Sequence, residues 1–335
     1  MKLLTLSILD QSPISEGQSA TEALRNTLQL AKWADQMGFK RFWVSEHHDT
    51  ESLAGSSPEV LISHVASHTK HIRVGSGGVM LTHYSSFKVA ENFKVLEALF
   101  PGRIDLGVGR APGGMPRASY ALGDGKPRDL KRYPLQIDEL NMYLHDTMPL
   151  DHPYYGLKAT PISDSIPDVW ILGTSPSSAV LAADKGLPYS FALFINGEGG
   201  EEYMRTYRKH FKPSAYLKSP KTMVSVFAIC AETDEKANYL AGSMDLSMLR
   251  SANGMSSKGT PHPDQFLSYS LTPFEKKSVE YNRRRMVVGS PKTVKEKILK
   301  IAEAYQTEEI MIASIMYDFK DKIRSYELIA NEFGM

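Results

Sequence analysis

Short apolar runs alternate with longer amphipathic stretches along most of the chain. Eight of the apolar runs predict strands, because they are brief, rich in branched and aromatic residues, and bounded by Gly, Pro or polar residues. These runs cover residues 3–9, 41–45, 72–76, 103–108, 169–172, 189–195, 223–229 and 310–315. Apolar positions at helical spacing predict helices over residues 19–37, 58–67, 87–99, 176–185, 201–210 and 291–305.

The alternation of strand and helix is typical of a parallel sheet. Continuous apolar strands also fit a sheet that is covered on both faces better than alternating strands would. A doubly wound sheet would give the same rhythm, but eight units without a boundary between two halves favour a closed barrel. We therefore expect an α/β fold, a (β/α)8 TIM barrel, which typically takes ~250 residues of the 335 in the chain.

Two segments interrupt the rhythm and account for the extra length. Residues 111–167 follow the fourth strand and contain two adjacent glycines, a polar helix near residues 129–145 and a Pro- and Tyr-rich stretch. Residues 251–285 follow the seventh strand and end in three consecutive arginines, Arg283 to Arg285. Segments of this length are usually functional. We expect both to be irregular insertions over the barrel mouth within one domain spanning residues 1–335. Residues 251–285 are the candidate lid, with arginines that could meet solvent, phosphate or an acidic partner protein.

Composition narrows the class of protein. Lys plus Arg number 39 and Asp plus Glu 38, a formal charge of +1 that argues against a dedicated nucleic-acid binder. The single cysteine, Cys230, excludes an intrachain disulfide and a cysteine zinc cage, and it suits a reducing compartment. The apolar run at the amino terminus is too short for a signal peptide, and no stretch approaches the ~20 apolar residues of a membrane span. We therefore expect a soluble cytoplasmic protein that does not contact membranes.

Residues at the carboxyl ends of the strands are the candidates for chemistry, because barrel active sites form there. The second strand is followed by Glu46-His47-His48-Asp49. An imidazole titrates near neutrality, so these histidines could donate or accept a proton. They could instead bind a metal or form a hydrogen-bonded structural cluster. A metal site is disfavoured, because the first strand ends in Leu9-Asp10-Gln11 and lacks the His-x-His of barrel metallohydrolases.

Glycines and an arginine follow the third and fourth strands. Gly77 and Gly78 indicate either close approach of a ligand to the backbone or a bulge in the barrel wall. Arg110 ends the fourth strand, where a guanidinium could grip a phosphate with two hydrogen bonds or form a structural ion pair.

A hydroxyl-rich turn follows the fifth strand, at Thr174-Ser175-Pro176-Ser177-Ser178. Ser175 is a favourable N-cap residue, and Pro176 occupies the first helical position, where proline is common. Free backbone N–H groups, hydroxyl groups and the positive end of the helix dipole together form an anion site. If the barrel forms, Arg110 and this helix start should meet above it.

Several of these segments together resemble the bacterial luciferase-like flavin monooxygenases. They are Glu46-His47-His48, the Val-Gly-Ser-Gly-Gly-Val run at 74–79, residues 100–110, Ser175-Pro176-Ser177-Ser178 and Val288-Gly289-Ser290-Pro291, so the resemblance covers nearly the whole chain. It implies a (β/α)8 barrel that binds reduced FMN (FMNH2) or, in some branches, the deazaflavin F420.

The resemblance also implies roles for particular residues. Arg110, Ser175 and Ser178 would hold the flavin phosphate, with the backbone of Thr174 contributing. Gly77-Gly78 match the position of a non-prolyl cis peptide under the flavin ring. His47 matches the family's catalytic histidine, with Glu46 and His48 as supports, and no metal takes part. Gly109 stands where the luciferases carry a reactive cysteine, so the resemblance is to the non-luminescent branch and does not imply light emission.

The function implied is that of a two-component monooxygenase. A separate flavin reductase would supply FMNH2, O2 would add to it as a C4a-hydroperoxide, and one oxygen atom would enter a small substrate such as an aldehyde. An F420-dependent hydride-transfer enzyme, a flavin-binding protein without catalysis and a metal-dependent hydrolase remain alternatives. The family also implies a homodimer, with contacts through the helices at residues 57–67 and 88–99.

Overall fold

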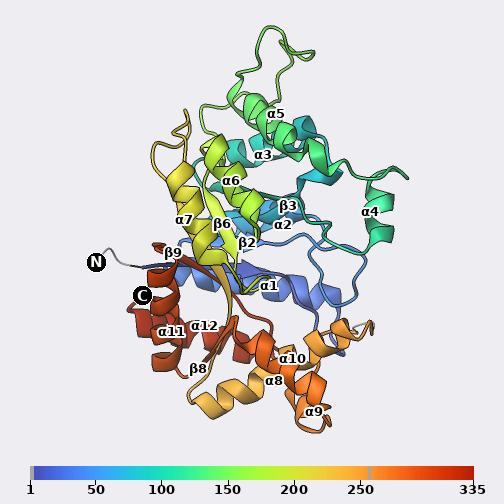
Figure 1. Cartoon of the computed structure of the whole chain (residues 1–335), viewed down its shortest axis with the longest axis vertical. Helices are drawn as coiled ribbons and strands as arrows, with labels where there is room; N and C mark the ends of the chain where they lie inside the picture. The colour runs from blue at the N-terminus through green and yellow to red at the C-terminus, as the bar shows by residue number, and fades with distance from the viewer. Residues whose placement is uncertain (1–3, 256–257) are drawn as a thin grey trace.

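The computed structural model describes residues 4–255 and 258–335 of the chain. Leu3 of the first predicted strand and residues 256–257 of the second predicted insertion lie outside the described residues. Strands gather at the centre of the molecule, and helices surround them (Figure 1). No helix in the described part of the chain is long and apolar enough to cross a membrane.

Eight parallel strands close into a barrel. They are β1 (Thr5–Asp10), β2 (Arg41–Val44), β3 (Arg73–Met80), β4 (Ile104–Gly109), β5 (Asp168–Gly173), β6 (Tyr189–Ala192), β7 (Thr222–Cys230) and β9 (Glu309–Ala313). Each strand from β1 to β7 pairs with the next, and β9 lies between β7 and β1 and completes the circle. The predicted (β/α)8 TIM barrel is confirmed, and each predicted strand overlaps one strand of the barrel.

Helices surround this barrel. They are α1 (Ala20–Met37), α2 (Pro58–Ser67), α3 (Ser86–Leu99), α4 (Pro116–Leu122), α5 (Tyr133–His145), α6 (Pro176–Lys185), α7 (Gly200–His210), α8 (Asp234–Ala252), α9 (Pro263–Leu267), α10 (Pro273–Arg283), α11 (Pro291–Ala304) and α12 (Phe319–Phe333). Short 3-10 helices cover η1 (Leu81–His83) and η2 (Leu130–Arg132). The sequence predicted α1, α2, α3, α5, α6, α7 and α11, whereas α4, α8, α9, α10 and α12 were not predicted.

The structure departs from the predicted strands in two places. β6 ends at Ala192, and residues 193–195, which were predicted to continue it, form a turn. A ninth strand, β8 (Met286–Gly289), was not predicted, and it pairs with the carboxyl half of β7 at residues 227–230.

The two insertions lie toward opposite ends of the long axis of the molecule (Figure 1). Residues 111–167 carry α4, η2 and α5, and the described part of residues 251–285 carries α9 and α10. Part of each segment is therefore helical, and the two do not share one position over the barrel.

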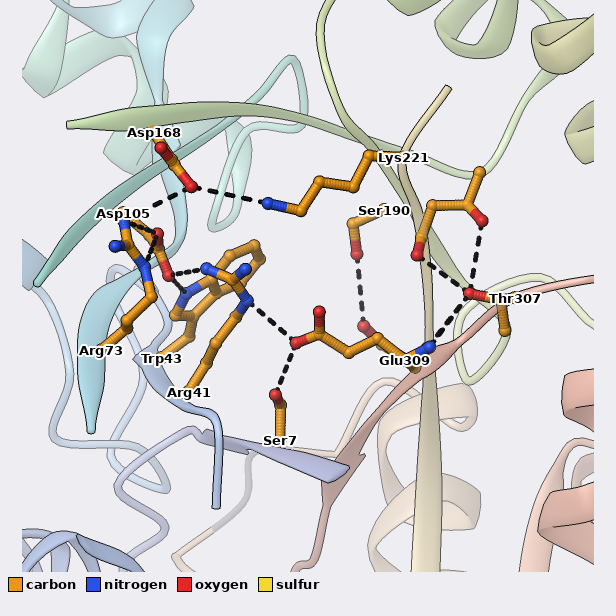
Figure 2. A network of polar contacts seen from close by, with 12 residues as sticks. Ser7, Arg41, Trp43, Arg73, Asp105, Asp168, Ser190, Lys221, Thr307 and Glu309 are labelled. Carbon is orange, nitrogen blue, oxygen red and sulfur yellow. Dashed lines mark hydrogen bonds and ion pairs between the residues drawn. The ribbon is translucent and has the colours of Figure 1, made fainter. Parts of the chain in front are cut away.

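Charged side chains fill the amino-terminal end of the barrel (Figure 2). The buried guanidinium of Arg41, on β2, contacts Asp105 on β4 at 2.6 Å through Nη1 and Glu309 on β9 at 2.9 Å through Nε. Arg73, on β3, pairs with the other oxygen of Asp105 at 2.7 Å. Ser7, on β1, donates a hydrogen bond of 2.6 Å to Glu309. Five strands are thus tied together by one set of buried ionic contacts.

Burial and ion pairing act in opposite directions on Asp105. Burial alone would raise the pKa of this fully buried carboxyl, but Arg41 and Arg73 hold its pKa below the usual value. Its Oδ2 also accepts a hydrogen bond of 2.9 Å from Nε1 of Trp43. The carboxylate therefore stays ionised and fixes the orientation of the Trp43 ring.

We expect Asp105→Asn to destabilise the protein strongly, because Arg41 would lose one of its two ionic partners while remaining buried. Breaking a buried ion pair on one side costs about 3–5 kcal/mol, measurable as a lower free energy of unfolding in urea. Asp184→Asn is the matched control, because Asp184 pairs with Lys212 at the surface, where such pairs contribute about 0–1 kcal/mol. Equal losses in the two variants would contradict the structural role of the network.

Candidate active site

A cavity of about 740 Å³ opens at the carboxyl ends of the strands. Its wall is built from segments that follow β3, β4, β5 and β6, together with residues inside the barrel. The lining residues are Leu9, Trp43, Gly77, Gly78, Met80, Gly109, Arg110, Ala111, Leu130, Lys131, Tyr133, Pro134, Leu172, Gly173, Thr174, Ser175, Ser177, Ser178, Leu181, Ser190, Ala192, Phe194, Ile195, Ser225 and Met311. The sequence predicted six of these as cofactor-binding residues, and the structure brings all six to this one cavity.

The first turn of α6 forms one polar wall of the cavity. Ser175 caps the helix: its Oγ accepts a hydrogen bond from the backbone N–H of Ser178, and the Ser178 side chain accepts one from the backbone N–H of Ser175. Pro176 at the first helical position needs no partner for a backbone N–H. The helix therefore presents its N-terminal dipole and three serine hydroxyl groups to the cavity.

Two cations line the same cavity, and no carboxylate in the lining neutralises them. Arg110 follows β4 and Lys131 belongs to η2, and within the described residues neither side chain has an ion pair or hydrogen bond. The structural ion pair considered for Arg110 is thus absent from the described part of the chain. The cavity lining includes no acidic residue. This end of the cavity is suited to an anion such as a phosphate.

Another part of the cavity wall contains the peptide between Gly77 and Gly78, which is cis. A Cβ at Gly78 would lie 2.5 Å from Cδ1 of Leu172 and 2.7 Å from the carbonyl oxygen of Gly107. A Cβ at Gly77 would lie 2.6 Å from Cδ1 of Leu9. Because side chains at these positions would collide with the barrel wall, glycine lets the strand backbone itself form the cavity surface.

Glu46 lies beside this wall as the buried centre of a hydrogen-bond cluster. Its Oε1 accepts from the hydroxyl of Tyr84 at 2.7 Å and pairs with Nε2 of His48 at 2.8 Å. Its Oε2 accepts from the backbone N–H of Met80 at 2.9 Å. Burial and the neighbouring Glu46 raise the pKa of Tyr84, which therefore stays a hydrogen-bond donor. The cluster ties the end of β2 to the end of β3.

His47 is half-buried and is not among the residues that line the cavity. Its backbone N–H donates to the carbonyl of Gly55 at 2.8 Å, and its Nδ1 lies 3.0 Å from Oγ of Ser45. Burial, reinforced by the nearby His48, lowers the pKa of His47 to about 4. The imidazole is thus neutral at neutral pH, and the predicted catalytic group is set apart from the predicted phosphate site.

Sequence reasoning missed several lining residues. Ser190 and Ser225 break otherwise apolar strands, and such isolated polar positions could have pointed to inward-facing side chains. Phe194 and Ile195 were predicted as strand, so their place in the cavity wall was not apparent. Nothing in the local pattern distinguished Lys131 from the other charged residues of its segment.

The predicted lid does not border the cavity, and neither do the cysteine and the surface histidines. In the described part of residues 251–285, no residue lines the cavity; Arg283 pairs with Asp245 at 2.7 Å, and Arg285 contacts the loop after β6. Cys230 is buried on β7, and burial raises the pKa of its thiol to about 12. His64 and His68 are exposed on α2. Among residues 4–255 and 258–335, no group of three His, Cys, Asp or Glu side chains could hold a metal ion.

Comparisons with known proteins give matches along nearly the whole chain. The sequence model of a family described as luciferase-like monooxygenase matches residues 2–308. The uncharacterized protein YwcH of Bacillus subtilis is 54% identical, over 99% of this chain and 100% of its own. The N-acetyl-S-alkylcysteine monooxygenase of Bacillus subtilis is 34% identical, over 98% of each chain.

Solved structures give the same picture of the fold. The crystal structure of apo-MsnO8 matches with a TM-score of 0.90 and 38% identity over 98% of each chain. The oxygenating constituent of 3,6-diketocamphane monooxygenase from Pseudomonas putida, in complex with FMN, has a TM-score of 0.74 at 21% identity and covers 98% of this chain and 97% of its own. An F420-dependent secondary alcohol dehydrogenase has a TM-score of 0.62 at 14% identity and covers 99% and 100%. The last two likenesses concern the fold alone.

The lowered pKa of His47 predicts a pH dependence of stability. The unfolded chain binds this proton near pH 6.5 and the folded chain near pH 4, so between these values the unfolded state holds more protons. The contribution of His47 to the free energy of unfolding is complete above pH 6.5, and it falls by about 3 kcal/mol as the pH approaches 4.

The free energy of unfolding in urea, plotted against pH from 4 to 7, should therefore have a shallower slope for His47→Asn than for the wild-type protein. Some slope should remain, because burial also lowers the pKa of His145 to about 4. Parallel pH profiles for the two proteins would contradict the buried, neutral state of His47.

Proposed function

Since the chain belongs to the luciferase-like monooxygenase family, we propose that it is a flavin-dependent oxidoreductase. It would use reduced FMN and O2 to place one oxygen atom in a small organic substrate. The observation that carries the proposal is that Arg110, unpaired within the described residues, and the first turn of α6 line one large, mostly apolar cavity. Reduced FMN, when bound, would supply the two electrons that activate O2.

The residues around the cavity fit the two ends of FMN. The cationic and serine-lined end suits the doubly charged phosphate, with Arg110, Ser175 and Ser178 donating to its oxygens and Thr174 contributing backbone. The apolar walls at Leu172 and the flat Gly77-Gly78 backbone suit a planar ring system. Ordered donors on one side and an uncharged wall on the other would orient the cofactor in one direction.

The Glu46 cluster supports a role for the neighbouring histidines in proton transfer. His47 is neutral at neutral pH, so the ring nitrogen that is free of hydrogen can accept a hydrogen bond from a group that carries the proton. Glu46 fixes the position of His48 and, through Met80, the edge of the cavity. His47 is thus the proposed catalytic histidine, and Glu46 and His48 are its supports.

Support for FMN over F420 comes from the comparisons. Phosphate recognition alone would serve either cofactor, and both kinds of enzyme share this fold. Among relatives above 30% identity, a monooxygenase is named, which favours oxygen chemistry over hydride transfer. We therefore keep the F420-dependent reaction as the alternative, together with flavin binding without catalysis.

The substrate we propose is a small, uncharged or anionic organic molecule. The walls beyond the serine-lined turn are apolar, including Met80, Phe194 and Met311, and the lining has no carboxylate to attract a cation. Aldehydes are one candidate class. Thioethers are a second, favoured by the relative that acts as an N-acetyl-S-alkylcysteine monooxygenase.

The proposal is tested by binding and by isotope incorporation. We expect FMN to bind more tightly than riboflavin, and Arg110→Ala to weaken FMN about ten- to a hundredfold, because a hydrogen bond between charged groups contributes about 1.5–3 kcal/mol. The affinity for riboflavin, which lacks the phosphate, should be unchanged in this variant. Arg117→Ala is the control, since Arg117 lies on the same insertion but pairs with Asp49 at the surface.

Turnover should then transfer one atom of labelled O2 to an aldehyde or thioether when a flavin reductase supplies reduced FMN. His47→Asn should lower this transfer while leaving the affinity for FMN unchanged. Tighter binding of F420 than of FMN would favour the alternative reaction. Tight FMN binding with release of all oxygen as peroxide, across the substrate panel, would favour flavin binding without catalysis.

We also propose a separate reductase, a cytoplasmic location and a homodimer. Exposed apolar residues support the dimer, because Val60 on α2 and Leu99 on α3 leave 70% and 59% of their surface open. Val60→Asp should convert the dimer to a monomer in sedimentation, since it would place a charge in an apolar contact. The control is Val180→Asp, at a half-exposed position on α6. A wild-type protein that sediments as a monomer would contradict this part of the proposal.

A further inference from the structure

The loop after β6 connects the serine-lined turn to a distant part of the chain. We define residues 193–199, between β6 and α7, as the strap. Phe194 and Ile195 of the strap line the cavity, and α7, which follows it, lies beside α6 (Figure 1). The strap therefore borders both the cavity and the helix that presents the serine hydroxyl groups.

Asn196 joins the strap to the turn. Its side-chain Nδ2 donates a hydrogen bond of 3.0 Å to the carbonyl oxygen of Thr174. Its Oδ1 accepts a hydrogen bond of 3.1 Å from the backbone N–H of Glu198, which shapes the strap itself. One half-buried amide thus holds two backbone segments, and one of them is the residue directly before the N-cap of α6.

Arg285 holds the strap from the other side. It follows α10, in the segment that the sequence predicted to be a lid, and its Nη1 donates to the carbonyl oxygen of Ile195. Its Nη2 donates to Asn282 at 2.6 Å. The Arg285 side chain also packs against Gly197, where an added Cβ would lie 3.3 Å from the Cβ of Arg285. The residues flanking Asn196 on both sides therefore contact Arg285.

The C=O of Thr174 and the N–H of Ser175 belong to one planar peptide unit, so a contact that fixes the direction of one also fixes the other. Since Asn196 binds the Thr174 carbonyl, the plane between Thr174 and Ser175 is fixed, and the N–H of Ser175 faces Oγ of Ser178 at 3.3 Å. Without Asn196 this plane would keep the hydrogen bond from Ser175 N–H to Ser178 but lose the one at the Thr174 carbonyl, and the Ser175–Ser178 cap would be held less firmly. An anion site of backbone and hydroxyl donors depends on that geometry.

We propose that Asn196 is a positioning residue for the Thr174–Ser175 turn, and that Arg285 keeps Asn196 in place. The segment after α10 thereby sets the affinity of the cavity for a phosphate-bearing ligand without contacting that ligand. The inference rests on the proposed function for the identity of the ligand, FMN, but its structural part can be measured without any ligand.

The test uses the whole protein and two readouts. The first is hydrogen exchange of the backbone amides at residues 175–178 in the ligand-free protein, and the second is the dissociation constants of FMN and riboflavin. Asn196→Asp keeps the acceptor for Glu198 but loses the donor to Thr174. Asn196→Ala removes both without adding a charge, and titration in high salt separates any charge effect of the aspartate.

We expect both variants to accelerate exchange about fivefold and to weaken FMN by a similar factor, as for the loss of one hydrogen bond. The dissociation constant of riboflavin should change less than about twofold, because riboflavin lacks the phosphate that the turn would bind. Unchanged exchange in Asn196→Ala would overturn the proposal, as would equal weakening of FMN and riboflavin. A wild-type protein that binds neither flavin would contradict the proposed function instead, and exchange alone would then decide the role of the strap.

Arg285 is tested against a contact at the edge of the strap. Arg285→Ala should act in the same direction as Asn196→Ala, and Arg285→Lys, which keeps one donor, should restore part of the loss. The double variant should weaken FMN no more than Asn196→Ala alone, since both act on one contact. Tyr281→Phe is the control, because Tyr281 reaches only the exposed Glu198 at 3.3 Å. Wild-type behaviour of Arg285→Ala, or full additivity, would overturn the role of Arg285.

Discussion

The rest of the barrel depends on the pairing of Arg41 with Asp105 and Glu309, which connects its strands at their amino-terminal ends. Charged groups of this kind cannot remain buried without partners, so the amino-terminal ends of five strands are committed to one ionic network. That network fills one end of the barrel. Because Asp105 also holds the indole of Trp43, which lines the cavity, the floor of the cavity is fixed by the same contacts that close the strands.

The other end of the barrel is polarised in a different way. Here the cations Arg110 and Lys131 lack ionic partners within the described residues, and the first turn of α6 adds the positive end of a helix dipole. An anion would supply the missing countercharge, and the remaining apolar walls would exclude water from what it carries. The chain belongs to the luciferase-like monooxygenase family, and this distribution of charge supports the ligand that we propose for it, a phosphate-bearing flavin.

The barrel could be predicted because buried parallel strands leave continuous apolar runs in the sequence, and the six cofactor candidates meet because carboxyl ends of parallel strands share one edge.

Helix α8 was missed, since it is buried on most sides and places Ala237, Gly242 and Ser243 where an amphipathic pattern would need large apolar residues. Residues 193–195 of the strap were predicted as strand because Phe194 and Ile195 are apolar, although these two residues line the cavity from a turn. The contacts of Asn196 with Thr174 and of Arg285 with Ile195 join residues 22 and 90 positions apart and leave no local signal. The position of His47 outside the cavity lining is likewise a matter of side-chain packing, which periodicity does not encode.

We propose that the cavity binds a flavin with its phosphate at the first turn of α6, and a crystal structure of the protein with FMN would test this binding mode. Phosphate density is expected between Arg110 and the serines at 175 and 178, with the ring against Gly77 and Gly78. Flavin density in the opposite orientation, or at a site outside this cavity, would contradict it.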